Sequence, residues 1–291
     1  MSSKALTMQR KEFLPLETGH LTESAIRKCE EELNERETLG RKAKGLQELR
    51  SLLQKNPKSE GIDFHEDFLV GFLRRNKYRV ENARQQILKL MHLHETENMF
   101  GGVPEEYLDL PSNKFLVLLP MRCQDDCALF ICRWGKWDPS ELPLEQLKQM
   151  VWMLILQSLR DPMTQINGFK IIHDLEGMSF KQLKYCTPSN FSLLYNSAVI
   201  CLPARYKEMH YISDSHLFKI IWNMIKPIMS EKIRNRVYFH SNKEELFHYF
   251  PRCIMPTVYG GDIQETAMED WIKRANKEHT KCTLRGQPNY Y

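Results

Sequence analysis

The chain has 291 residues, of which 42% are hydrophobic and 27% are charged, and its net charge is +4; this composition is ordinary for a soluble globular protein, and the charge alone predicts no partner. The sequence has no run of about 18 apolar residues, and its first residues, MSSKALTMQRKEF, include no apolar stretch, so we expect neither a transmembrane span nor a secretory signal. Without an export signal, the eight scattered cysteines are expected to be reduced thiols of a cytoplasmic protein.

The N-terminal third has the pattern of a flexible arm followed by a small helical domain. We expect residues 1–20 to form the arm and residues 21–98 to form the helical domain. Thr22 is a good N-cap for the first helix, because an acidic turn follows it. The leucines of LGRKAKGLQELRSLLQKNP have helical spacing, and two further helices follow with a break near residues 76–79.

Beyond residue 98 the pattern changes to strands that alternate with helices. Such alternation predicts an α/β domain with a mostly parallel sheet over residues 99–262, and residues 263–291 form a polar tail with one short helix. Thr187 and Pro188 are a good cap and first-turn pair for one of these helices. The expected strands are residues 114–120, 127–135, 168–177, 205–213 and 236–241.

The stretch NMIKPIMSEKIRNR, residues 223–236, combines apolar residues, basic residues and a proline. Counted with the residues before it, apolar side chains recur every four positions from Leu217 to Ile233, which is typical of a wide apolar helix face. Pro227 removes one helical hydrogen bond and would kink or end the helix. A buried core helix, a membrane-touching helix and a lid that is each in turn are the three interpretations of this pattern.

Basic charge is concentrated in residues 201–240. This segment has seven Lys and Arg against three acidic residues, an excess of four that equals the excess of the whole chain. Arg205 and Lys207 lie two apart on a predicted strand and so share one side of it. A solvated basic face is the alternative to an anion-binding surface. A nucleic-acid site is disfavoured, because the basic residues lie beside an apolar helix and not beside a stacking platform.

Seven short stretches then occur in a characteristic order between residues 64 and 262. They resemble the CRAL-TRIO family of lipid-binding proteins, in particular its animal branch with the α-tocopherol transfer protein, cellular retinaldehyde-binding protein and the clavesins. The resemblance implies a helical N-terminal domain and a lipid-binding α/β domain, whose sheet floors a deep apolar cavity under a mobile amphipathic gate helix. The stretches are FLVGFLRRNKYRVENA, GKWDP, NGFKIIHDLEGMSF, TPSN, LPARYKEMHYIS, MIKPIMSEKIRNRVYFH and MPTVYGG.

The resemblance also implies three sets of site residues. One position departs from the family pattern: Asn76 stands where an arginine is usual, and Arg75 or Lys77 are the candidates to replace it. The implied cavity lining is Val151, Ile155, Phe169, His173, Cys186, Leu194, Ser197, Ala198, Leu202, Ala204 and Met209. The implied gate residues are Leu217, Phe218, Ile221, Trp222, Ile225 and Met229. The implied phosphoinositide-binding residues are Arg205, Lys207, Lys232 and Arg74.

These observations predict a non-enzymatic carrier of a hydrophobic small lipid such as a tocopherol, a retinoid or a similar isoprenoid. We expect no cofactor beyond the lipid and no metal, because Cys123, Cys127 and Cys132 lack the C-x-x-C pairs of common zinc sites. His173 shares a strand face with Phe169 and offers either a polar contact to the ligand or a structural hydrogen bond. Docking on anionic, phosphoinositide-containing membrane is expected. The second hypothesis is a phosphoinositide-binding adaptor that is recruited to membranes in endosomal trafficking and transfers no cargo.

Overall fold

A five-stranded sheet forms the centre of the molecule. The structure is a computed structural model that describes residues 21–33, 36–97, 99, 101–213, 217–264 and 271–281. The strands lie side by side in chain order; β1 is antiparallel to β2, and the other neighbours are parallel. The predicted α/β class with a mostly parallel sheet is confirmed. The strands are β1 (Leu116–Leu118), β2 (Ala128–Arg133), β3 (Phe169–Asp174), β4 (Tyr206–Ile212) and β5 (Val237–His240).

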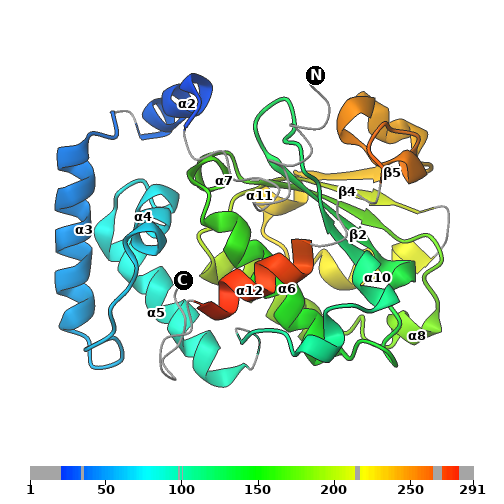
Figure 1. Cartoon of the computed structure of the whole chain (residues 1–291), viewed down its shortest axis with the longest axis horizontal. Helices are drawn as coiled ribbons and strands as arrows, with labels where there is room; N and C mark the ends of the chain where they lie inside the picture. Colours follow the sequence, from blue (N-terminus) through cyan, green and yellow to red (C-terminus); the bar gives the residue numbers. More distant parts are fainter. Residues whose placement is uncertain are drawn as a thin grey trace, which may run out of the picture.

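In the part of the chain that the structure describes, four α-helices precede the sheet and lie to one side of it (Figure 1). The Thr22 hydroxyl accepts a hydrogen bond from the Ala25 amide at 3.2 Å, which caps the first helix as the sequence predicts. The expected break between the third and fourth of these helices occurs where Lys77 and Tyr78 adopt positive φ angles of 53° and 57°. The helices are α2 (Glu23–Leu33), α3 (Leu39–Gln54), α4 (Glu66–Arg75) and α5 (Val80–Thr96).

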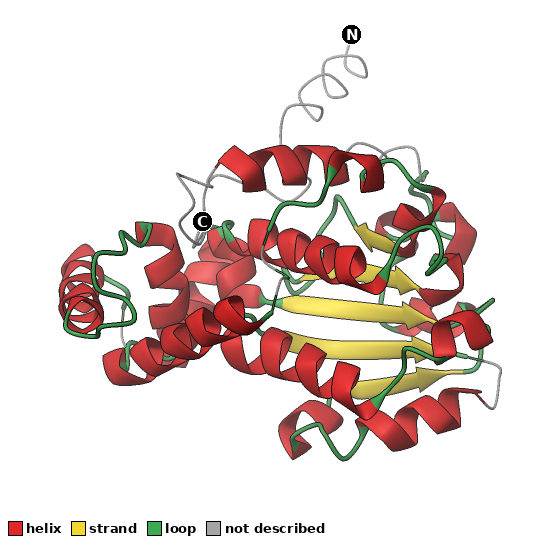
Figure 2. Ribbon diagram, turned by 90° about the horizontal axis from the view of Figure 1, so that it is seen from below, coloured by secondary structure: helices red, strands yellow, loops and turns green. Residues whose placement is uncertain are grey.

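The remaining helices pack around the sheet (Figure 2). The long helix between β2 and β3 is largely buried, and the C-terminal helix α12 packs against it. Thr187 caps its helix by accepting from the Asn190 amide at 3.2 Å. These helices are α6 (Leu144–Leu159), α7 (Pro162–Asn167), α8 (Phe180–Leu183), α9 (Pro188–Tyr195), the π-helical turn η4 (Asn196–Cys201), α10 (Leu217–Ile225), α11 (Glu231–Arg234) and α12 (Trp271–Lys281).

Short 3-10 helices occupy several of the connections. They are η1 (Glu105–Tyr107), η2 (Pro111–Phe115), η3 (Trp134–Lys136), η5 (Glu244–His248), η6 (Arg252–Ile254) and η7 (Thr257–Tyr259).

One continuous cluster of buried apolar residues runs from Leu46 in α3 to Ala275 in α12. Helices α3, α4 and α5 therefore share their core with the sheet region, whereas Ala25 and Cys29 of α2 pack in a smaller cluster with residues of α7. The predicted division of the chain near residue 98 stays a prediction. The predicted arm, residues 1–20, lies outside the described residues, and so do residues 265–270 and 282–291. No helix in the described ranges has the length and apolar character needed to span a bilayer.

Candidate functional site

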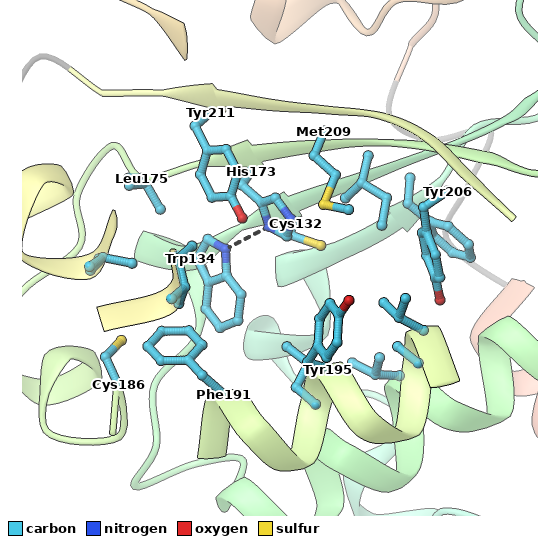
Figure 3. Close-up of a pocket in the computed structure, with 18 of the residues that line it drawn as sticks. Cys132, Trp134, His173, Leu175, Cys186, Phe191, Tyr195, Tyr206, Met209 and Tyr211 are labelled. Carbon is cyan, nitrogen blue, oxygen red and sulfur yellow. Dashed lines mark hydrogen bonds between the residues drawn. The ribbon is translucent and has the colours of Figure 1, made fainter. Parts of the chain in front are cut away.

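An apolar cavity of about 180 Å³ lies between the sheet and α10. Strands β2, β3 and β4 supply one wall, α6, α9 and η4 supply another, and α10 with the segment after it closes the space. Figure 3 shows side chains from the strands and from α9 pointing into it from opposite sides. None of the lining residues is Lys, Arg, Asp or Glu, so the cavity suits an uncharged apolar molecule.

Strand alternation decides which residues face this cavity. On β3, Ile171 and His173 border it, and on the neighbouring β4 Met209 and Tyr211 border it. The alternate residues of β4, Glu208 and His210, do not. This is the period of two expected for a sheet whose two faces are covered differently.

Seven of the eleven predicted cavity positions line the space. They come from α6, β3, the loop before α9, α9 itself, η4 and β4, which are far apart in the sequence and meet only in the fold. The seven are Val151, Ile155, His173, Cys186, Leu194, Ala198 and Met209.

The other four predicted positions are buried next to the cavity but do not border it, which corrects the sequence prediction. Phe169 is packed between Phe130 and Tyr206, with ring centroids 5.5 and 5.9 Å away, so these three rings fill that end of the sheet. Ser197 turns its hydroxyl back to the carbonyls of its own helix, including Leu194 at 3.0 Å. Leu202 and Ala204 are 0% and 1% exposed and belong to the solid core.

The predicted gate residues divide between two sides of α10. Ile221 and Ile225 line the cavity, and each is 4% exposed. Phe218 and Trp222 instead pack on Phe239 of β5, at centroid distances of 4.9 and 5.0 Å. The side chain of Leu217 lies outside the described residues.

The assignment of Met229 to the gate helix is wrong, although Met229 lines the cavity. Helix α10 ends at Ile225, two residues before Pro227. Proline has no amide hydrogen and disfavours helical geometry in the residue before it, so the helix cannot continue through Lys226. Met229 therefore reaches the cavity from the turn between α10 and α11.

Several lining residues were missed from the sequence. Trp134 directly follows β2, and Tyr211 lies two residues after Met209 on β4. The period of two along β4 would have found Tyr211, because Met209 was already assigned to the cavity. The other missed positions are Phe115, Leu116, Phe130, Cys132, Ile171, Leu175, Met178, Phe191, Tyr195, Val199, Tyr206 and Ile228.

His173 is held in one orientation by its neighbours. The Trp134 indole N–H donates to His173 Nδ1 at 3.2 Å (Figure 3), and the imidazole stacks on Tyr211 with ring centroids 4.6 Å apart. Burial, and secondarily the charge of His210, lowers the pKa of His173 to about 4. The imidazole is therefore neutral at pH 7. Burial also raises the pKa of the neighbouring Cys132 thiol to about 12, so this cysteine is an unreactive lining group.

A second apolar space of about 100 Å³ adjoins the first. The two spaces share part of their walls, including Trp134, Val151 and Phe191. A ligand longer than the main cavity can extend into this chamber if the shared side chains move.

Arg205 and Lys207, two of the predicted basic residues, lie where α2 meets the start of β4, and both are already paired. Arg205 and Lys207 both form ion pairs with Glu32 of α2, and the Lys207 Nζ lies 3.6 Å from that carboxylate. The Arg205 guanidinium also donates to the backbone carbonyls of Ile166 and Arg74 at 3.1 and 3.0 Å. The two residues share one side of the strand, as predicted, and that side is covered by a carboxylate.

The structure brings further positive side chains to this surface. Burial, followed by the charges of Arg205 and Arg236, lowers the pKa of Arg75. Burial, followed by Arg236, Arg75 and Lys77, lowers the pKa of the exposed Lys232. These groups are thus close enough to repel one another. We call the set of Arg75, Lys77, Arg205, Lys207, Lys232 and Arg236 the basic cluster.

Arg74 does not belong to this surface, in contrast to the prediction. It is 7% exposed. Its guanidinium makes a bidentate contact with Glu37 and donates to Gln165 Oε1 at 2.8 Å. These contacts join α4 to α7 and to the residues after α2, so Arg74 holds the fold together and its head group does not reach solvent.

Comparison with known protein families shows which family the chain belongs to. The model of the CRAL/TRIO domain matches residues 112–261, which is 150 of the 291 residues. The chain belongs to the CRAL/TRIO domain family. The matched region contains the whole sheet, α6, α9 and α10, and every residue that lines the cavity.

Similar proteins of this family are known in mammals. The chain is 28% identical to the mouse protein named alpha-tocopherol transfer protein-like. The alignment has 283 residues and covers 92% of this chain and 82% of the mouse protein. It is 25% identical over 275 residues to human clavesin-2, covering 87% and 78%. Among solved structures, Sfh5 has a TM-score of 0.49 and 11% identity over 90% of this chain and 99% of that one.

Within the described part of the chain, no three His, Cys, Asp or Glu side chains are placed to share a metal ion.

Proposed function

We propose that this protein carries a hydrophobic small lipid in the cavity and exchanges it at anionic membranes. The observation that carries the proposal is the apolar, uncharged cavity beneath α10, whose inner side chains Ile221 and Ile225 close it. The names of the tocopherol-transfer-like relatives support a tocopherol-, retinoid- or isoprenoid-like cargo. The protein acts as a carrier in the cytoplasm and not as an enzyme.

Helix α10 has the properties of a gate that opens onto lipid and not into water. Its inner residues are buried, while Ile220 on the same helix is 51% exposed and Phe239 beside it is 49% exposed. Exposing a buried Ile to water costs about 1.5–3 kcal/mol. In a bilayer interface the same side chains stay in apolar surroundings, so membrane contact lowers the cost of opening. Phe180 of α8, which is 82% exposed, offers a second apolar contact to lipid.

The basic cluster supports docking on anionic lipid. Each Lys or Arg near an anionic surface contributes about 1 kcal/mol of attraction, and an arginine binds phosphate oxygens in pairs. Because Glu32 occupies Arg205 and Lys207, a phosphoinositide phosphate would have to replace this carboxylate. Arg75, Lys77, Lys232 and Arg236 do not depend on that exchange, since none of them is paired with Glu32 in an ion pair.

Identification of bound lipid is the first test. The protein is purified from a eukaryotic host, extracted with organic solvent and analysed by mass spectrometry beside the variant with Arg205, Lys207 and Lys232 all changed to Ala. The expected result is one enriched isoprenoid-like molecule at near-stoichiometric amount in both proteins. A phospholipid in the cavity would indicate phosphoinositide exchange in place of isoprenoid transport.

Transfer between vesicles is the second test. The identified lipid is loaded into donor vesicles, and its appearance in acceptor vesicles with and without phosphatidylinositol bisphosphate is followed in time. We expect the wild-type protein to accelerate transfer and the triple variant to lose the dependence on acceptor charge. Binding to anionic vesicles without any transfer would contradict the carrier proposal and favour the endosomal adaptor.

A further inference from the structure

The main cavity is small for the cargo of a lipid carrier. Its volume is about 180 Å³, whereas sites for drug-sized ligands occupy about 300–1,000 Å³. An engineered protein cavity of about 150 Å³ holds benzene or xenon. The adjoining chamber adds about 100 Å³, which brings the two spaces together close to the lower limit for a ligand site. A lipid with a long chain therefore needs more room than the main cavity offers.

The wall between the two spaces is made of side chains that border both of them. These side chains come from η2, η3, α6, α9 and the loop before α9, and no residue of a described strand is among them. Rotation of a few side chains would thus join the spaces without moving the sheet. The residues that line both spaces are Phe115, Trp134, Val151, Cys186, Phe191 and Leu194.

Trp134 is the largest side chain of this wall, and it is only partly buried. Its indole N–H donates to His173 Nδ1 at 3.2 Å, and its ring packs edge-on against Phe115 with centroids 5.0 Å apart. Trp137, which lines only the second chamber, is 2% exposed and donates to the Leu142 carbonyl at 2.8 Å. Trp134 can therefore turn aside at the loss of one hydrogen bond, while Trp137 keeps the outer wall in place.

Helix α9 covers both spaces without a solid core beneath it. None of its eight residues is buried, although Phe191 and Tyr195 point from it toward the strands (Figure 3). The helix continues into the π-helical turn η4, whose Ala198 and Val199 line the main cavity. π-Helical turns are rare and are frequently found at functional sites. A ligand that fills both spaces would give α9 the apolar packing that the protein alone does not supply.

We propose, as an extension of the lipid-carrier function above, that the chain end of the cargo passes Trp134 and occupies the second chamber. The cargo is then an uncharged lipid whose apolar chain is longer than the main cavity can hold. The walls that belong to the second chamber alone suit such a chain, since they include the rings of Trp137, Trp152 and Tyr185 and the side chains of Leu144 and Leu147.

The test compares geraniol, farnesol and geranylgeraniol, which share a head group and differ by one isoprene unit each. Binding to the wild-type protein is measured by calorimetry. Each methylene group that moves from water into an apolar site contributes about fourfold in affinity. Geranylgeraniol should therefore bind at least about tenfold more tightly than farnesol, because its last unit enters the second chamber.

Leu147→Trp fills the second chamber, since Leu147 lines this chamber and not the main cavity. The variant should lose about tenfold in affinity for geranylgeraniol and keep the wild-type affinity for geraniol within about twofold. Ala198→Phe is the matched control, because it fills the main cavity and should weaken the binding of all three alcohols. An unchanged affinity for geranylgeraniol in Leu147→Trp would overturn the proposal.

A second measurement uses the wild-type sequence and so does not depend on a variant that could misfold. The five tryptophans are replaced by 5-fluorotryptophan, and their 19F resonances are followed during titration. Trp137 and Trp152 line only the second chamber, whereas Trp222 packs on Phe239 at the outer side of α10. Geranylgeraniol should shift the resonances of Trp137 and Trp152, and geraniol should leave both in place.

Two outcomes of the fluorine measurement separate this proposal from the carrier function. A shift of Trp222 without a shift of Trp137 or Trp152 would show that α10 moves outward to make room, which would overturn the second-chamber assignment and leave the lipid cavity in place. Failure of all three alcohols to bind the wild-type protein would count against the main cavity as an isoprenoid site and so remove the basis of both proposals.

Discussion

The cavity and the basic cluster were predicted from the same resemblance, but the fold treats their residues in opposite ways. In the cavity, predicted side chains such as Val151 and Met209 border open space. In the basic region, Arg205 and Lys207 are covered by Glu32, and Arg74 is buried against Glu37. The cavity thus has open space for a ligand, whereas part of the basic region is already paired with the protein's own carboxylates.

The difference follows from what each kind of side chain costs when it is half-buried. An apolar side chain beside a void loses only some packing contacts. A half-buried guanidinium without a partner is strongly disfavoured, so such groups are found with carboxylates or carbonyls. A count of basic residues along the sequence therefore identifies a region of positive charge but not which of its cations are free.

The largest effect is expected from filling the cavity. Ala198 of η4 lines the space, and Ala198→Phe places a ring in it. Binding of the identified lipid should fall roughly a hundredfold or more, because the two cannot occupy the same volume. Vesicle binding through the basic cluster should be unchanged. Equilibrium dialysis and vesicle sedimentation measure the two properties, and Ala198→Ser is the control that keeps the volume. A simultaneous loss of vesicle binding would show that the two sites are not separate.

A pH dependence of stability is expected from His173. Its pKa is about 4 in the folded protein, below the usual 6.5, so between these values the unfolded chain binds a proton that the folded one does not. The free energy of unfolding should therefore fall as pH drops through this window, by up to roughly 3 kcal/mol from this residue. In His173→Phe this part of the slope should disappear.

Urea unfolding at pH 7 and pH 4.5 measures this effect as a difference between the two proteins. His173→Phe also leaves the Trp134 N–H without its acceptor, which should lower stability at both pH values alike. An equal pH dependence in wild type and variant would mean that the His173 ring is hydrated in the folded protein.

Much of the architecture was predictable, because it depends on local patterns. All five strands and the sheet type follow from apolar runs that alternate with helices. The ends of the cavity were not predictable in the same way. Phe169 has the strand face that the period of two requires, but Phe130 and Tyr206 fill the space in front of it. Whether a side chain on that strand face borders the cavity or packs against another aromatic ring depends on residues that are distant in sequence.

Separation in sequence also explains why the burial of Arg74 and the ion pair of Arg205 were not predicted. Glu32 and Arg205 are 173 positions apart, and no periodicity relates them. Their contact depends on how α2 lies against the start of β4. Gly168, at φ 84°, allows that strand end to come close, since a Cβ there would meet the Arg205 carbonyl oxygen at 2.2 Å.

A smaller effect than those of the cavity variants is expected on the outer side of α10. Trp222→Asp removes an aromatic ring that packs on Phe239 and adds a charge where the helix would enter lipid. Release of bound lipid at anionic vesicles should slow about tenfold. Asn223→Asp, an exposed neighbour on the same helix, adds the same charge without removing the ring and should slow release less. Equal release rates in wild type and Trp222→Asp would remove this helix from the exchange step.

The smallest effect is expected at Glu32. Glu32→Gln should tighten binding to vesicles that contain phosphatidylinositol bisphosphate by about fivefold, because it frees cations worth about 1 kcal/mol each at an anionic surface. The fold should persist, since Arg205 keeps its bonds to the carbonyls of Ile166 and Arg74. Glu31→Gln is the matched control: it changes the net charge equally on the same helix, but Glu31 is exposed. If both variants bind alike, the gain comes from net charge alone, and Glu32 does not compete with lipid phosphate for Arg205 and Lys207.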